Sequence, residues 1–183
     1  HPNGGRIAGV VGLASIVVWN AADYTVRERR YGYFQTSPNA LFLPAANRIV
    51  TGVGGTAVNV WDATDGALLG AIHFPSYVED LALHPDGRRF AVDAHLCTYI
   101  FDIASTEPLH RWHVGGFTTE LVFSPSGALL LRHGWRGTHV WDVESGEHLR
   151  LIDTNDGGPG AVFTHDERQI VAPTREEDRR MAF

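Results

Sequence analysis

The chain repeats itself every 40 to 42 residues, and this period constrains its fold more than any other feature. The first marker is an aromatic residue followed by a polar one, which occurs at Trp19-Asn20, Trp61-Asp62, Phe101-Asp102 and Trp141-Asp142. A second marker, at a turn, keeps the same step at His1-Pro2, Leu43-Pro44, His84-Pro85, Ser124-Pro125 and Thr164-His165. Because two independent markers share one period, the sequence predicts tandem structural units.

Each unit contains four short segments with strand character, separated by turn residues. The first segments precede the turn marker (40–42, 81–83, 121–123 and 161–163), and the second follow it (48–51, 89–92, 128–131 and 169–172). The third end on the aromatic residue (58–61, 98–101 and 138–141), and the fourth carry Leu69, Leu109 or Leu149. No segment has a helical period over ten or more residues. Four strands in about 40 residues predict an all-β fold, a β-propeller of four-stranded antiparallel blades.

One unit carries a pattern that can be compared with a known family. It contains Phe123-Ser124-Pro125-Ser126-Gly127, then Gly137-Thr138-His139-Val140-Trp141-Asp142, then Ser145-Gly146. The pattern resembles the WD-repeat (WD40-like) β-propeller family, and the resemblance spans essentially the whole chain. The acidic turn residue of that family, six positions before the aromatic residue, is replaced here by Gly55, His95 or Trp135. The polar tetrad that often links such blades is therefore largely absent, and we expect a divergent propeller held together mainly by apolar packing between sheets.

The period divides the chain into three whole units and two partial ones, which together form one partial β-propeller domain spanning 1–183. The whole blades are predicted at about 34–74, 75–114 and 115–155, and the partial blades at about 1–33 and 156–183. The first partial unit lacks an innermost strand and the last lacks an outermost strand, so the remainders do not add up to one blade. Since known propellers have roughly four to eight blades, we expect an incomplete ring whose missing blades belong to a longer chain.

Charge and composition limit the class of partner. The formal net charge is -6, whereas a general nucleic-acid binder normally carries a basic surplus. No apolar run reaches the length of a membrane span, and a single cysteine, Cys97, excludes an internal disulfide. All fifteen basic residues are arginine, which indicates a GC-rich, bacterial genome. We expect a bacterial, cytoplasmic protein that binds neither nucleic acid nor membrane.

The residues that could carry chemistry do not form a recognisable catalytic or metal motif. The ten histidines show no His-x-x-x-His spacing, and the glycine-rich runs lead into strands instead of a helix N-terminus. The run Asp153-Thr154-Asn155-Asp156-Gly157 lacks the alternating ligands of a calcium loop. The sequence also has no Gly-x-Ser-x-Gly elbow. We therefore predict a non-catalytic protein without a metal site or a cofactor.

One loop is the best candidate for a binding site. His133-Gly134-Trp135-Arg136-Gly137 joins a second strand to a third, and in the WD-repeat family this loop lies on the rim most often used for partners. Trp and Arg are among the residues most enriched in binding hot spots. The remaining residues predicted on this protein-binding rim are Tyr77, Glu79, His95, Phe117 and Glu120. The predicted function is a protein-interaction scaffold, the propeller portion of a larger bacterial protein.

An alternative function stays open at this point. The chain could be a quinoprotein-like propeller enzyme or small-ligand binder with its site in the central channel. Such a site needs several ionisable groups from different blades at one end of the axis. Glu79, Asp80 and Glu120 approach this arrangement, whereas the other blades offer Asn39 and Pro159.

Overall fold

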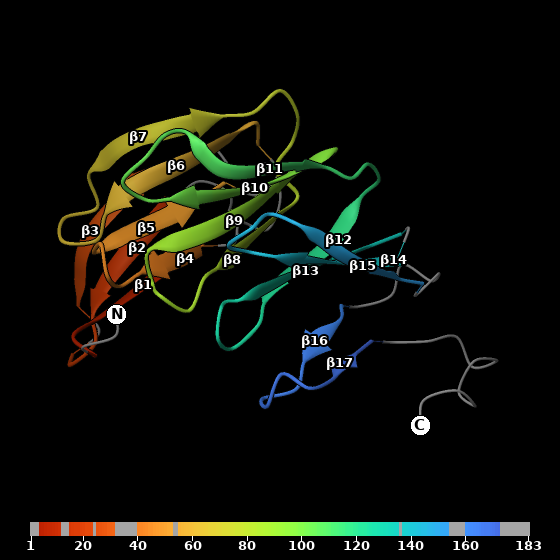
Figure 1. Cartoon of the computed structure of the whole chain (residues 1–183). Coiled ribbons are helices and arrows are strands. Elements are labelled where there is room, and N and C mark those ends of the chain that lie inside the picture. Colours follow the sequence, from red (N-terminus) through yellow and green to blue (C-terminus); the bar gives the residue numbers. More distant parts are fainter. Residues whose placement is uncertain are drawn as a thin grey trace.

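The computed structural model describes residues 4–11, 15–23, 25–31, 40–52, 55–135, 137–153 and 160–172, and every regular element among them is a β-strand (Figure 1). The first sheet consists of β1 (Arg6–Val11), β2 (Ser15–Asn20) and β3 (Val26–Tyr31). The second consists of β4 (Ala40–Leu43), β5 (Arg48–Thr51), β6 (Ala57–Asp62) and β7 (Leu68–His73). The third consists of β8 (Asp80–Leu83), β9 (Arg89–Ala94), β10 (Cys97–Asp102) and β11 (Pro108–His113). The fourth consists of β12 (Thr118–Phe123), β13 (Leu129–Gly134), β14 (Gly137–Asp142) and β15 (His148–Ile152). A separate two-stranded sheet consists of β16 (Val162–Phe163) and β17 (Ile170–Val171).

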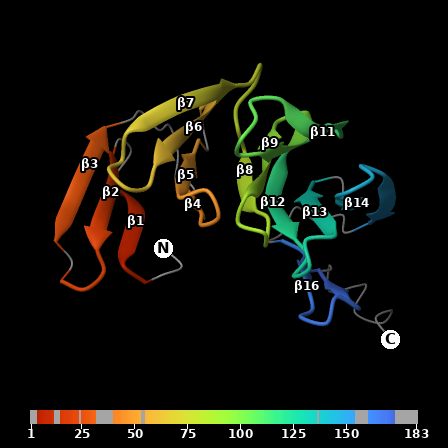
Figure 2. The same ribbon diagram turned by 60° about the vertical axis from the view of Figure 1, so that its left-hand side comes forward.

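The sheets follow one another around an arc in chain order (Figure 2). Within each sheet the strands are antiparallel and hydrogen-bond in sequence order, so each sheet is a simple meander. The first strand β8 contacts β4 on one side and β12 on the other, whereas β7, β11 and β15 form the opposite edges of their sheets. This arrangement confirms the predicted all-β fold of four-stranded antiparallel blades. No helix that could span a membrane occurs in the part of the chain that the structure describes.

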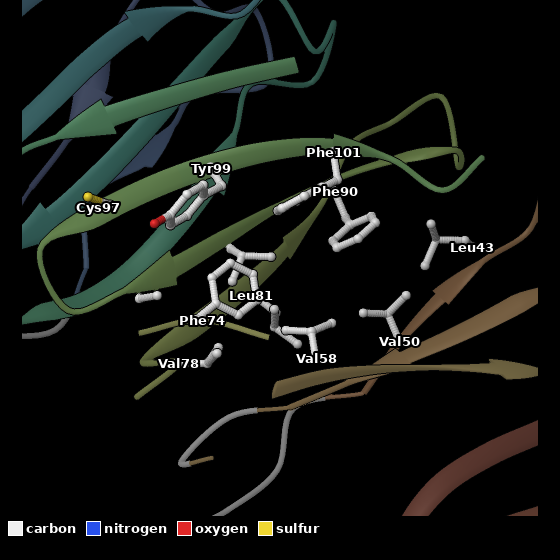
Figure 3. Close-up of a cluster of buried hydrophobic side chains, with 12 residues drawn as sticks. Leu43, Val50, Val58, Phe74, Val78, Leu81, Phe90, Cys97, Tyr99 and Phe101 are labelled. Carbon is white, nitrogen blue, oxygen red and sulfur yellow. The ribbon is translucent and has the colours of Figure 1, made fainter. Parts of the chain in front are cut away.

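The largest apolar cluster fills the space between the β4–β7 and β8–β11 sheets. The rings of Phe90, Tyr99 and Phe101 point from the β8–β11 sheet toward the side of Val50 and Val58 (Figure 3). Phe90 and Phe101 stack with their ring centroids 5.6 Å apart. The next cluster lies between the β8–β11 and β12–β15 sheets and contains Ala82, Ala91, Ile100, Leu121, Phe123, Leu130 and Val143. The β8–β11 sheet is therefore covered on both faces, as expected for units that are stabilised by their neighbours.

The repeated aromatic residue occupies the same buried place in each four-stranded sheet. Trp61, Phe101 and Trp141 are all nearly fully buried close to the end of the third strand. In the first sheet Trp19 holds the corresponding position in β2 and is half-buried. The marker found in the sequence therefore reports a core position.

A β-bulge recurs immediately before this aromatic residue. The pairing between third and fourth strands changes register at the same step in each four-stranded sheet, at Val60/Trp61, Ile100/Phe101 and Val140/Trp141. The residues skipped by this pairing on the fourth strands are Leu69, Leu109 and Leu149. All three are exposed, as are paired neighbours such as Leu68 and Leu151, because the fourth strands form the outer edges of their sheets. The leucines that repeat in the sequence are thus bulge residues at the outer edge.

Buried polar groups also join neighbouring sheets, so the expectation of mainly apolar packing between blades is incomplete. Asp93 of β9 and Arg132 of β13 are 0% and 1% exposed, and Arg132 Nε lies 3.1 Å from Asp93 Oδ1. The hydroxyl groups of Thr98 and Thr118 donate to the same carboxylate. A buried charge is tolerated when it is both paired and hydrogen-bonded. The sequence did not predict this ion pair, because Asp93 and Arg132 lie inside second strands. The acidic residue that is typical of the WD-repeat family lies instead in the turn that follows the second strand.

A second polar link joins the turns of two neighbouring blades. The buried His84 accepts the Asp86 N–H at Nδ1, so its Nε2 carries the proton and donates to the carbonyl oxygen of Gly127 over 3.0 Å. The His84 ring also meets the Phe123 ring edge-on at 4.9 Å. Gly127 has a φ of 81°, in the left-handed region. This position needs glycine both for its backbone and for the close approach of the imidazole.

We expect Gly127→Ala to lower the free energy of unfolding by about 1–3 kcal/mol, the range for a residue held in a sparsely populated backbone region. An added Cβ would also overlap the buried His84 ring. The control is Gly70→Ala in β7, where a Cβ meets open space and the change should stay within about 0.5 kcal/mol. Chemical denaturation measures both. Equal stability of the two variants would show that the turn adapts and that the His84 contact is dispensable.

Candidate functional site

Three aromatic rings from different segments meet on one rim of the molecule. Trp135 lies in the β13–β14 turn, is 67% exposed and donates its backbone N–H to the carbonyl oxygen of Phe117 over 3.4 Å. Phe117 belongs to the connection between β11 and β12, and its ring centroid lies 6.1 Å from that of Trp135. On its other side the Phe117 ring meets His95, of the β9–β10 turn, edge-on at 5.0 Å. We call His95, Phe117 and Trp135 the rim patch.

His95 is held in place by its backbone and by a carboxylate. Its φ of 56° is left-handed, which is uncommon for a residue other than glycine. Its Nδ1 lies 3.0 Å from Glu79 Oε1, and Glu79 Oε2 accepts the backbone N–H of Thr118 over 2.7 Å. Glu79 therefore fixes both the imidazole and the start of β12. The middle of the rim patch is supported by a carboxylate that bridges two blades.

Arg132 supports the rim patch from within. Its Nη2 donates to the carbonyl oxygen of Gly116 over 2.6 Å and approaches that of His95 at 3.5 Å. These two carbonyl groups belong to the backbone that carries Phe117 and His95. Sequence reasoning missed Arg132, although one signal was present: a single arginine directly after the apolar run 129–131 of a predicted strand. The buried ion pair with Asp93 thus connects the core to the rim.

The other predicted site residues are placed differently. Tyr77 is exposed on the connection before β8, and among the described residues it makes no ring contact with the rim patch. Glu79 is largely buried beneath His95. Glu120 lies against Gly160, where an added Cβ would overlap its carboxylate. Arg136 lies outside the described residues. The structure therefore brings together His95, Phe117, Trp135 and Glu79 of the predicted set.

Comparison with known proteins identifies the fold. No protein-family model matches the chain. The small ribosomal subunit protein RACK1y of Oryza sativa subsp. japonica is 30% identical over 111 residues, which cover 60% of this chain and 32% of RACK1y. The crystal structure of the Myceliophteria thermophila Cps50 (Swd1) β-propeller domain matches with a TM-score of 0.72 at 19% identity, over 92% of this chain and 58% of that one. The chain folds as a WD40-like β-propeller. It spans about a third of the length of the rice relative.

The carboxylates near the inner strands of the propeller serve as links between blades. Asp80 Oδ2 accepts the backbone N–H of Leu121 over 2.7 Å, and Glu79 binds Thr118 and His95 as described. Both groups therefore reach from the β8–β11 sheet to the β12–β15 sheet. Asn39 and Pro159, the residues that other blades offer in place of an ionisable group, lie outside the described residues, as does most of the Asp153–Gly157 segment. Two of the three carboxylates that suggested a channel site, Glu79 and Asp80, are thus used as structural acceptors.

A second cluster of rings lies on β11, β14 and β15. Trp112 stacks on Trp141 at 5.1 Å, and His139 also stacks on Trp141, at 5.2 Å. His148 lies 5.2 Å from Trp141, and its Nε2 is 3.1 Å from His139 Nδ1. Burial, together with the charges of His148 and Arg132, lowers the pKa of His139 to about 4. His139 is therefore uncharged at neutral pH.

Proposed function

We propose that this propeller is a non-catalytic scaffold that binds a protein partner through the rim patch. The observation that carries the proposal is the exposure of rings that touch one another: Trp135 is 67% exposed and Phe117 is 55% exposed. Large rings gain most when a partner excludes water from around them, and such residues dominate binding hot spots. The support from Glu79 and Arg132 keeps this surface in one arrangement, which lowers the entropic cost of binding.

The relatives and the composition support the finer parts of the same proposal. RACK1y carries the name of a ribosomal subunit protein, a component of a large assembly. The non-catalytic part rests on the use of Glu79 and Asp80 as links between blades. A bacterial source is supported by the arginine-only basic composition, and a cytoplasmic location by the free, buried Cys97. Further blades in a larger protein are supported by the repeat count, since known propellers have roughly four to eight blades.

We expect Trp135→Ala to weaken partner binding by about 2 kcal/mol or more, the scale of a hot-spot residue, with little effect on folding. The reason is that the indole contacts Phe117 at the surface and is mostly in water. The experiment captures a partner with the intact protein and then measures its dissociation constant for the unmodified chain and for Trp135→Ala by calorimetry.

The matched control is Leu109→Ala, which removes another exposed apolar side chain, at the outer edge strand β11. Binding should survive this change, because Leu109 is a bulge residue away from the rim patch. The proposal would be wrong if Leu109→Ala abolished binding while Trp135→Ala left it intact. Equal loss in both variants would also contradict it, since that result points to a general requirement for exposed apolar surface.

A further inference from the structure

Two histidine side chains on paired outer strands hold their ring nitrogens at a separation that suits a shared ion. His139 lies on β14 and His148 on β15, and Nδ1 of the first is 3.1 Å from Nε2 of the second. As neutral rings they share one proton, donated by one nitrogen and accepted by the other. Nine residues separate them in sequence, so no local histidine spacing announces the pair.

The distance is the one that a transition metal imposes on neighbouring ligands. Imidazole nitrogens bind zinc at about 2.0–2.1 Å, which places two ligands of one ion about 2.8–3.4 Å apart for angles between square-planar and tetrahedral. The observed 3.1 Å falls inside this interval. An ion can therefore take the place of the shared proton once both rings turn so that their nitrogen lone pairs point at it.

The rings are also held ready for this exchange. His139 is stacked on Trp141 with an interplanar angle of 16°, and His148 leans on the same indole. Trp141 is buried and itself stacks on Trp112 of the neighbouring sheet. Because the indole pair is a rigid platform, little ring freedom is lost when an ion binds, which favours affinity.

The space beside the pair leaves room for further ligands. A cavity of about 350 Å³ lies beside the pair. It is lined by the two histidines, by Trp112 and Trp141, and by three residues at or just after the end of β11, namely Arg111, His113 and Val114. Water or an anion from solution can enter it and complete the coordination of an ion at the two nitrogens.

We propose that His139 and His148 form an exchangeable binding site for a divalent transition-metal ion of the copper, nickel or zinc kind. These are the ions that imidazole ligands suit. The site differs from a closed structural centre, because only two protein ligands hold the ion. The described residues contain no cluster of three or more His, Cys, Asp or Glu arranged for a metal, and the proposal concerns a two-ligand site open to solvent. It is independent of the proposed rim function.

The test titrates the untagged chain with Cu²⁺ and with Zn²⁺. Bound Cu²⁺ quenches nearby indole fluorescence, and Trp141 and Trp112 lie beside the pair. Calorimetry with Zn²⁺ gives the affinity without relying on fluorescence. The unmodified chain should show saturable quenching and saturable heat. His148→Ala and His139→Gln should each weaken the affinity at least about tenfold, since even outer-sphere changes alter metal affinity about 10–100-fold.

The matched control is His110→Ala. His110 stacks on Trp112 at 5.6 Å and lies against the turn at Gly146, and it does not line the cavity beside the pair. This variant should keep the affinity and the quenching of the unmodified chain. Circular dichroism checks that each variant is folded, and His148 is exposed, so its loss should not disturb the sheet. Equal titration curves for His148→Ala and the unmodified chain would overturn the proposal, as would loss of binding in His110→Ala alone.

Discussion

Arg132→Met should lower the free energy of unfolding by about 3–5 kcal/mol, the cost of leaving a buried charge without its partner. Asp93 is fully buried, and without the guanidinium its carboxylate keeps only neutral donors such as the Thr98 hydroxyl. Methionine has a similar length and fills much of the same volume, so the loss reports the charge pair more than a cavity. Urea denaturation of both proteins measures the difference.

Arg150→Met is the matched control, because Arg150 is an exposed arginine on β15. Its loss should change stability by no more than about 0.5 kcal/mol. Arg132→Met should also weaken partner binding at the rim, since Arg132 donates to the carbonyl oxygens of Gly116 and His95. Equal stability of the two methionine variants would show that the Asp93–Arg132 ion pair does not stabilise the fold. It would also contradict the argument that this ion pair supports the rim patch.

Trp141→Ala should cost about 3–5 kcal/mol of folding free energy, as expected for removing a large buried ring and leaving a cavity. Trp141 is 2% exposed, and its ring stacks with those of Trp112 and His139. The substitution removes the ring contact of both Trp112 and His139, so packing is lost in two neighbouring sheets. Thermal and urea unfolding curves should shift together.

Trp135→Ala provides the contrast within the same β14 hairpin. Its indole is mostly in water, so the free energy of unfolding should change little while partner binding falls. The two tryptophan variants therefore separate the core from the working surface. A loss of stability in Trp135→Ala comparable with that in Trp141→Ala would place Trp135 in the core and remove the basis of the proposed site.

The strands were predictable because their signals are local. Proline turns and the aromatic marker place β4 and β10 within a residue or two of the observed bounds. The second strands were predicted too short: β9 continues to Ala94 and β13 to Gly134. The apolar pattern stops at Asp93 and Arg132, where charged residues usually mark a strand end. Here the two charges neutralise each other, so the ladder continues to the rim.

The site was predictable only in part, because its contacts join different blades. The exposure of Trp135 follows from its glycine-flanked turn, which the sequence displays. The contact of Phe117 with His95, and the bond of Glu79 to Thr118, depend on how one sheet is turned against the next. The pairing of His139 with His148 depends on the register of β14 and β15, including the bulge at Trp141. No spacing along the chain encodes these relations directly.

The bulge before each aromatic residue also determines where insertions and deletions can accumulate. Removing a paired residue of β15 after the bulge, such as Leu151, would turn the next side chain to the opposite face and bring Ile152 out of the core. Removing the unpaired Leu149 would leave the pairing of Arg150, Leu151 and Ile152 with β14 unchanged. The chain can gain or lose residues freely only where side chains do not have to alternate between a buried and an exposed face. The paired residues Thr51 and Asn59 of the β4–β7 blade enclose a rim turn. This turn is one residue longer than the turn between the equivalent pair, Val92 and Tyr99, of the β8–β11 blade. Blades of this protein can therefore diverge in the length of their rim turns while the buried register stays unchanged.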